Sequence, residues 1–205
     1  YICVCIYINM YTCITSDVYV PVLDNPILEP EVSEEVSDLN SDKTAGSDGV
    51  PPGIIRLLPP SWIVFITFLL NNIFLSSFYP QSWSIAKLFT IHKKGNKMLP
   101  SNYRGITIIN CLAKVYDMIL CKRIQHWFSP YREQAGSQKG RGCLEHITTL
   151  RLISELAKKK KIKLYIVFVD FAQAYDKVSR VVLYTILKRL GCGATMLLAL
   201  IAMYK

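Results

Sequence analysis

One stretch constrains the fold of this chain more than any other: residues 164–169 (LYIVFV) form an uninterrupted apolar run that ends on Asp170. Aromatic and β-branched side chains dominate the run, which predicts a β-strand buried on both faces. A carboxylate at the end of such a strand is costly unless a positive partner offsets its burial. Asp170 is therefore a candidate metal ligand, because phosphoryl-transfer sites hold metal ions with carboxylates in this way. The alternative is an Asp that caps a turn or the next helix.

Charge is divided unevenly along the 205 residues. Residues 1–80 carry two basic and nine acidic side chains, a net of −7, whereas residues 81–205 carry 22 basic and six acidic ones, a net of +16. A basic excess of this size predicts a polyanionic partner, most commonly nucleic acid. A solvated basic surface and a contact with an anionic membrane are the alternatives.

The cysteines and the N-terminal segment indicate the cellular compartment in which the protein is expected. Seven cysteines are scattered without CxxC pairs or zinc-like spacing, which predicts free thiols in a nuclear or cytoplasmic, reducing compartment rather than a secreted protein. The uncharged residues 1–16 are too short and interrupted for a membrane helix, and they lack the basic start of a signal peptide. We expect no membrane partner and treat residues 1–26 as an N-terminal extension whose status is open.

Hydrophobic periodicity predicts a mainly helical chain with one hairpin. Three prolines in residues 21–30 indicate a linker, and Val32, Val36 and Leu39 recur at the spacing of a short acidic helix. The almost wholly apolar residues 54–75 predict a helix buried deep in a core. Further helices are expected at 111–128, at 144–157, between Asp176 and Gly191, and at 194–204. Their expected buried faces are Leu112, Val115, Ile119, Leu120, Ile124 and Trp127; Leu144, Ile147, Leu150, Ile153 and Leu156; and Val178, Val182, Ile186 and Leu190.

Basic and glycine-rich loops are the candidate anion-binding segments. A two-stranded arm, 86–91 and 102–109, carries Lys93 and Lys94 at its tip and Arg104 on its return strand. Such an arm can grip a triphosphate or a nucleic-acid backbone; a solvated hairpin tip is the alternative. The loop 43–51 (KTAGSDGVP) has turn chemistry, but the chain contains no GxxxxGK[ST]. A second glycine-rich basic loop spans Gln134–Gly142.

Taken together, five blocks resemble the reverse transcriptase of non-LTR (LINE-type) retrotransposons, over about residues 27–205. The blocks, in order, are KTAGSDGVP, WSIAKLFTIHKKGNK…NYRGITIIN, EQAGSQKGRG, FVDFAQAYDKV and LKRLGCG…MYK. Ser137 departs from the aromatic residue common in the third block, and His92-Lys93 departs from a more usual Pro or Phe context. Residues 1–16 match nothing in the family.

The resemblance implies an α+β right-hand polymerase fold that is mostly helical, with a short fingers hairpin and the first palm strand. It places the fingers region at residues 27–163 and the start of the palm at 164–205. The chain would then be an N-terminal fragment without the rest of the palm and the thumb. Whether a full-length protein also carries an upstream endonuclease domain stays open.

Site residues follow from the same resemblance. Asp170 matches the first metal-binding aspartate of the polymerase, and the backbone carbonyl of Phe171 would help to hold the second of two Mg²⁺ ions. Tyr175 matches the aromatic gate that selects deoxynucleotides. The incoming deoxynucleoside triphosphate would contact the group Lys93, Lys94 and Arg104, and nucleic acid would contact Lys139 and Arg141. Asp176 is expected to be structural, through helix capping.

The implied activity is RNA-directed DNA synthesis on an RNA template from a DNA primer, by two-metal nucleotidyl transfer. The Tyr/Phe-Ala-Asp-Asp motif that supplies the next carboxylate is absent from the 205 residues, so we expect this chain to be inactive alone. Three rival interpretations stay open: a P-loop NTPase, which the missing GxxxxGK[ST] argues against; a non-catalytic nucleic-acid-binding remnant; and a fragment that never folds stably.

Overall fold

The computed structural model describes residues 16–138, 140–171, 174–175 and 177–204. Its elements are α2 (Pro21–Asp24), α3 (Glu29–Ser37), α4 (Pro52–Arg56), α5 (Pro60–Ser76), the 3-10 helix η1 (Gln81–Trp83), β1 (Lys87–His92), the 3-10 helix η2 (Pro100–Asn102), β2 (Tyr103–Ile108), α6 (Cys111–Trp127), α7 (Cys143–Lys159), α8 (Arg180–Arg189) and α9 (Ala194–Met203). The chain divides into two compact units, in which unit 2 is Phe128–Val178 and unit 1 is the remainder. No helix in these described ranges has the length and apolar character needed to cross a membrane.

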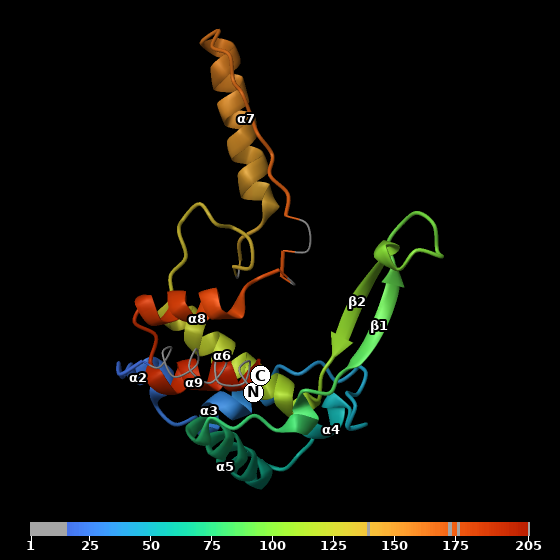
Figure 1. Cartoon of the computed structure of the whole chain (residues 1–205), viewed down its shortest axis with the longest axis vertical. Helices are drawn as coiled ribbons and strands as arrows, with labels where there is room; N and C mark the ends of the chain where they lie inside the picture. The colour runs from blue at the N-terminus through green and yellow to red at the C-terminus, as the bar shows by residue number, and fades with distance from the viewer. Residues whose placement is uncertain (1–15, 139, 172–173, 176, 205) are drawn as a thin grey trace, which may run out of the picture. The chain divides into compact units, whose positions relative to one another are not determined.

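Unit 1 is a helical body with one projecting hairpin. Figure 1 shows α6 running through the middle of its helices and the β1–β2 hairpin extending away from them. α6 packs against α2 and α3, while α5 packs against α3 and α9. The predicted buried face of α6 is confirmed at Val115, Ile119 and Leu120, which are almost fully buried. The short acidic helix predicted from Val32, Val36 and Leu39 is confirmed as α3, and the helix predicted at 194–204 is confirmed as α9.

The linker predicted from the prolines at 21–30 is wrong. Pro21 begins α2 and Pro30 lies in the first turn of α3, where a missing backbone N–H costs nothing. Leu23 and Ile27 between them are buried in the core. Residues 1–15 lie outside the described part, and the domain boundaries at 26/27 and 163/164 stay predictions.

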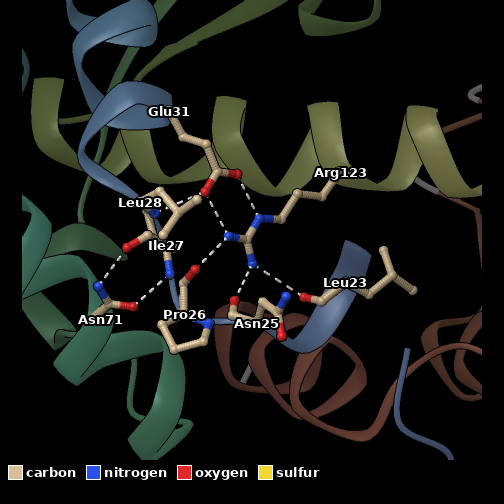
Figure 2. Close-up of polar contacts among 8 residues, drawn as sticks. All are labelled: Leu23, Asn25, Pro26, Ile27, Leu28, Glu31, Asn71 and Arg123. Carbon is tan, nitrogen blue, oxygen red and sulfur yellow. Dashed lines mark hydrogen bonds and ion pairs between the residues drawn. The ribbon is translucent and has the colours of Figure 1, made fainter. Parts of the chain in front are cut away.

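A single arginine holds this proline-containing segment. Arg123 on α6 donates from Nε and Nη2 to the Glu31 carboxylate at 2.8 and 2.7 Å. Its Nη1 donates to the carbonyls of Leu23 and Asn25 and its Nη2 also to that of Pro26, so every guanidinium N–H has an acceptor (Figure 2). The same figure shows the Asn71 side chain of α5 bonded to both backbone groups of Ile27.

The hairpin is the predicted two-stranded arm. β1 and β2 pair antiparallel with Lys87 opposite Ile108 and His92 opposite Tyr103. Lys93 N–H donates to the Asn102 carbonyl at 2.8 Å and closes the turn, and Gly95 takes the positive φ of 84° that the turn needs.

The strand predicted at 164–169 is wrong. Residues 162–171 have no regular secondary structure, and Tyr165 and Val167 are 85% and 84% exposed. A strand needs a neighbour for its backbone hydrogen bonds. Within the described part of the chain β1 and β2 pair only with each other, so this run has no ladder to join.

Two further burial predictions are wrong although the helices exist. None of the described side chains of α7 is buried, and its apolar residues Leu144, Ile147 and Leu156 are exposed. On α8, Val182 and Ile186 are exposed, and Tyr184 is buried instead. α8 is apolar on two faces, so its periodicity could not tell which one packs on α9. Gly191 follows Leu190, the C-cap residue of α8, and has the positive φ of 81° that is common directly after a helix.

Candidate functional site

The tip of the hairpin presents cations from an ordered turn. Asn102 Nδ2 donates to the Asn96 carbonyl at 2.8 Å, and His92 stacks edge-on against Tyr103 at 5.3 Å between ring centroids. Gly95 has a φ of 84°, which strains any residue with a side chain, and a Cβ there would also lie 2.9 Å from Asn102 Nδ2. Lys93 and Lys94 are exposed in this turn. The hydrogen-bonded turn therefore carries two exposed lysine side chains at the tip of the hairpin.

Arg104 lies on β2 opposite Ile91 and is exposed. Because side chains alternate across a strand, the pairs Lys87–Ile108, Phe89–Ile106 and Ile91–Arg104 share one face of the hairpin. That face combines apolar surface with a cation at each end. Such a combination suits a nucleotide, which has a planar apolar base and an anionic phosphate.

At the root of the hairpin, Asn110 fastens the loop 43–51. Its Oδ1 accepts the Ser47 hydroxyl at 2.8 Å and the Asp48 N–H at 3.2 Å, and its Nδ2 donates to the Ser82 carbonyl at 3.1 Å. Asn110 is 4% exposed. A Cβ on Gly46 would lie 2.6 Å from Asn110 Oδ1, so only glycine allows this approach. The side chain thus joins the loop, η1 and the start of α6.

A cavity of about 520 Å³ lies beside this junction. It is lined by Lys43, Thr44, Gly46, Val50, Pro52, Ile106, Thr107, Ile108, Ile109, Cys111 and Lys114. Burial raises the pKa of the Cys111 thiol although the Lys114 charge acts the other way, so the thiol is protonated at neutral pH. The lining side chains of the cavity are mainly apolar, and Lys43 and Lys114 are the cations among them. Two of the blocks recognised in the sequence, KTAGSDGVP and NYRGITIIN, meet at this cavity.

Sequence reasoning missed Asn110, Gly46 and Arg123 as organising residues. Asn110 stands where a strand passes into a helix, a position that an amide side chain can cap. Arg123 follows Ile119 by four residues and Leu120 by three, so a cation on the apolar face of α6 was the available signal for a buried ion pair.

The other predicted site residues belong to unit 2. Asp170, Phe171 and Tyr175 are exposed and lie in irregular backbone. Lys139 and Asp176 lie outside the described residues. A site that joins Asp170 to Lys93, Lys94 and Arg104 of unit 1 stays a prediction.

Arg141, a predicted nucleic-acid contact, is engaged within its own loop. It bonds the Glu145 carboxylate from Nε at 3.0 Å and from Nη2 at 2.6 Å, and its Nη1 donates to the carbonyls of Arg132 and Gln134. The hydrogen bonds from Arg141 hold the pKa of Glu145 below its usual range. Arg141 therefore orders the glycine-rich loop, and its contact with nucleic acid stays a prediction.

Mg²⁺ prefers oxygen ligands, and the Asp170 carboxylate and the Phe171 carbonyl are of that kind. Among the residues that the structure describes, no group of three or more His, Cys, Asp or Glu side chains could hold a metal ion. The described residues thus fit Mg²⁺ in kind but do not complete a site for it.

Comparison with known proteins identifies the family. The family model described as "Reverse transcriptase (RNA-dependent DNA polymerase)" matches residues 91–204, more than half of the chain. The probable RNA-directed DNA polymerase from transposon BS of Drosophila melanogaster is 28% identical over 158 residues, which cover 75% of this chain and 17% of that protein.

Two further relatives are also RNA-directed DNA polymerases by name. The probable RNA-directed DNA polymerase from transposon X-element of Drosophila melanogaster is 27% identical over 167 residues, covering 76% of this chain and 18% of that protein. The RNA-directed DNA polymerase from mobile element jockey of Drosophila funebris is 27% identical over 159 residues, covering 75% and 17%. The chain spans less than a fifth of the length of these relatives. The resemblance to non-LTR retrotransposon enzymes is confirmed, and the chain belongs to the reverse transcriptase (RNA-dependent DNA polymerase) family.

Proposed function

We propose that this chain supplies the nucleotide-binding and template-binding fingers of an RNA-directed DNA polymerase. The observation that carries the proposal is the junction at Asn110, which fixes the loop 43–51 against the root of the basic hairpin beside a cavity lined by Lys43 and Lys114. Lys93, Lys94 and Arg104 would hold the triphosphate by charge and by the forked guanidinium. An RNA template, a DNA primer and deoxynucleoside triphosphates are the proposed partners.

Chemistry in the longer protein would centre on Asp170. We propose that its carboxylate and the Phe171 carbonyl contribute to a two-Mg²⁺ site, where the ions would activate the primer hydroxyl and neutralise the leaving pyrophosphate. Tyr175 would exclude a ribose 2′-hydroxyl. The exposed position of all three residues supports a role toward ligands rather than in packing.

We further propose that the 205-residue chain does not copy a template by itself. Two metal ions need at least two carboxylates between them, and the sequence has no Tyr/Phe-Ala-Asp-Asp motif after Asp170. Incubation with a primed RNA template, Mg²⁺ and the four deoxynucleotides is expected to leave the primer unextended. Sustained extension would contradict this.

A second candidate is a nucleic-acid-binding remnant without chemistry. It is favoured by one observation: residues 162–171, around the proposed catalytic carboxylate, form no sheet. This candidate keeps RNA binding but has no reason to bind a triphosphate, so the two functions differ in a direct binding measurement.

The test is equilibrium binding to the full chain. Fluorescence anisotropy would follow a labelled single-stranded RNA and, separately, a fluorescent deoxynucleoside triphosphate with Mg²⁺. The triple variant Lys93→Ala/Lys94→Ala/Arg104→Ala is expected to weaken triphosphate binding at least tenfold. For RNA, losing three phosphate contacts would reduce the slope of log K against log salt by about 2.

A matched control removes two lysines elsewhere. Lys158 and Lys159 end α7 and are exposed; replacing both by Ala is expected to leave triphosphate binding unchanged. If this control weakens binding as much as the triple variant does, general charge rather than the hairpin binds the ligand. RNA binding without any triphosphate binding would favour the remnant.

A further inference from the structure

α5 has no charged residue in its 17 positions, and it is apolar on two opposite sides. Its inner side buries Ile66, Leu70, Ile73 and Phe74 against a body formed with α3 and α9. Its other side, which we call the outer face of α5, is exposed. It consists of Trp62, Phe65, Phe68, Leu69, Asn72 and Leu75. Trp62, Phe65 and Phe68 are 52%, 68% and 70% exposed, contrary to the sequence prediction of a deeply buried helix. In Figure 1 α5 lies at the margin of the helices of unit 1.

The outer face has the spacing of a helix-pairing seam. Phe65, Phe68, Asn72 and Leu75 follow one another at intervals of three, four and three residues, as the a and d positions of paired helices do. Asn72 is anchored by its Nδ2, which donates to the Phe68 carbonyl at 2.9 Å. Trp62 and Leu69 flank the seam, and Trp62 packs on Phe65 at 6.1 Å between ring centroids. The stripe is thus an organised ridge with one polar position.

The size of the outer face argues that something covers it. Its three aromatic side chains each expose roughly 100–150 Å², from total areas of about 150–250 Å². With Leu69 and Leu75 the apolar area is on the order of 500 Å² per copy, near the upper limit for a monomer surface. Two such faces would bury about 1,000 Å², the lower limit for a specific interface. The area therefore fits a reversible dimer rather than a permanent one.

The chemistry of the outer face selects the partner. A face without charge has no cation for a phosphate and no ion pair for a charged protein. A second copy is complementary to it without any charge. The intervals three, four and three read the same in both directions, so an antiparallel two-fold pair sets Phe65 opposite Leu75 of the other copy and Phe68 opposite Asn72. We propose that the outer face of α5 forms an antiparallel, two-fold helix pair with a second copy of this chain.

Sedimentation velocity of the full chain over a hundredfold concentration range tests this. A reversible monomer–dimer equilibrium is expected, with Phe65→Glu/Phe68→Glu raising the dissociation constant at least tenfold. The neutral pair Phe65→Ser/Phe68→Ser is expected to act in the same direction, and far-UV circular dichroism checks that both variants stay folded. The matched control is Val182→Glu/Ile186→Glu on α8, where both side chains are similarly exposed at 55% and 47%; it is expected to leave the dimer unchanged.

Orientation has its own test. Phe68→Glu alone weakens the pair, whereas Phe68→Glu/Asn72→Lys restores at least tenfold of the lost affinity, because the antiparallel arrangement sets the new carboxylate opposite the new ammonium of the other copy. A parallel pair would show no rescue. Four results would each overturn the proposal. The chain could be monomeric at every concentration, or it could be a monomer that co-sediments with uncharged lipid vesicles. It could also form a dimer, or open-ended aggregates, that the α5 variants do not affect.

Discussion

Arg123 illustrates how one side chain decides the path of a whole segment. Burial of Glu31 acts to raise its carboxyl pKa, but the hydrogen bonds from Arg123 and from the Leu28 N–H, with the charges of Arg123 and Lys122, hold it below its usual value. Arg123 is 7% exposed, and the Cζ of its guanidinium also lies over the Phe74 ring, 5.5 Å from the ring centroid. Without it, three backbone carbonyls near the prolines would lose their donor.

Arg123→Ala is expected to destabilise the protein by about 3 kcal/mol, because it leaves buried acceptors and a half-buried carboxylate without their partner. Urea unfolding followed by circular dichroism measures the loss. Arg151→Ala is the control, since Arg151 pairs with Glu155 on an exposed helix surface and should cost less than about 1 kcal/mol. The stability that the ionised Glu31 carboxylate contributes should be lost as pH falls through and below 4.5, the usual pKa of Glu, because the pKa of Glu31 in the folded protein is lower than that value. Equal losses for the two arginine variants would refute this role for Arg123.

Asp117 presents the opposite case. Burial raises its pKa to about 6, and its Oδ1 is buried without a hydrogen-bond partner. The side chain lies near the phenols of Tyr79 and Tyr116, both of whose pKa values are raised chiefly by burial and further by the Asp117 charge. An acid with a raised folded pKa destabilises the fold once it ionises, so stability should fall as pH rises from about 4 to 6.

Asp117→Asn removes this charge at nearly constant shape. The variant is expected to be more stable than the parent chain by about 1–2 kcal/mol at pH 7.5 and equal to it at pH 4. Urea unfolding at the two pH values checks the prediction. A variant that is less stable at pH 7.5 would mean that the ionised carboxylate has a partner that the structure does not reveal.

Among the elements, α9 depends on a carboxylate from a distant part of the chain. Asp24 of α2 accepts the Met196 N–H at 3.1 Å through Oδ1 and the Val20 N–H at 2.7 Å through Oδ2. It thereby satisfies a free N–H in the first turn of α9 and complements the positive end of the helix. Gly193 precedes that turn, and a Cβ there would lie 1.9 Å from Asp24 Oδ2.

Gly193→Ala should therefore destabilise the protein by about 2–3 kcal/mol, because the new methyl group displaces Asp24 from the helix end. Gly142 offers a matched control, since it is the N-cap residue of α7 as Gly193 is of α9, and a Cβ there meets nothing within 4 Å. Thermal unfolding of the two variants makes the comparison. Similar melting temperatures would show that the Asp24 contact does not hold α9.

Element by element, the sequence predicts what local periodicity encodes. It locates α3, α6, α7, α9 and the hairpin, because their apolar spacing and turn residues are local signals. It cannot say what lies against a helix that is apolar on two sides. For that reason the exposed outer face of α5 and the buried face of α8 were predicted wrongly, whereas α7 has a single apolar face that is exposed among the described residues. The strand at 164–169 failed likewise, since a strand depends on a neighbour that the run itself does not encode.

In the candidate site, too, local features could be predicted from the sequence and contacts between distant residues could not. The basic tip and Arg104 follow from composition and turn chemistry. The hydrogen bond from the Ser47 hydroxyl to Asn110 Oδ1 joins residues 63 positions apart, and neither residue type identifies the other. The family resemblance includes both the loop 43–51 and the hairpin, but only the structure shows that the side-chain amide of Asn110 joins them.

For the molecule as a whole, the two units differ in how much core they have. Unit 1 buries side chains from α2, α3, α5, α6, α8 and α9, whereas Ala135 is the one buried apolar residue among the described residues of unit 2. Stability against local opening follows buried apolar contact. Unit 2 is therefore expected to open and to be cleaved first, above all in residues 162–171.

Limited chymotrypsin digestion, at a concentration that keeps the chain monomeric, checks this. Cleavage should begin at Tyr165, Phe168 or Phe171, because a protease needs extended, accessible backbone and not merely an exposed ring. Phe65 and Phe68 of α5 are the internal control: Phe68 is 70% exposed and Phe168 81%, but Phe68 lies in a helix whose backbone hydrogen bonds must open first. Mass spectrometry of the early fragments identifies the sites. If α5 is cut as early as residues 165–171, side-chain exposure rather than backbone structure controls cleavage, and the difference between the two units does not exist.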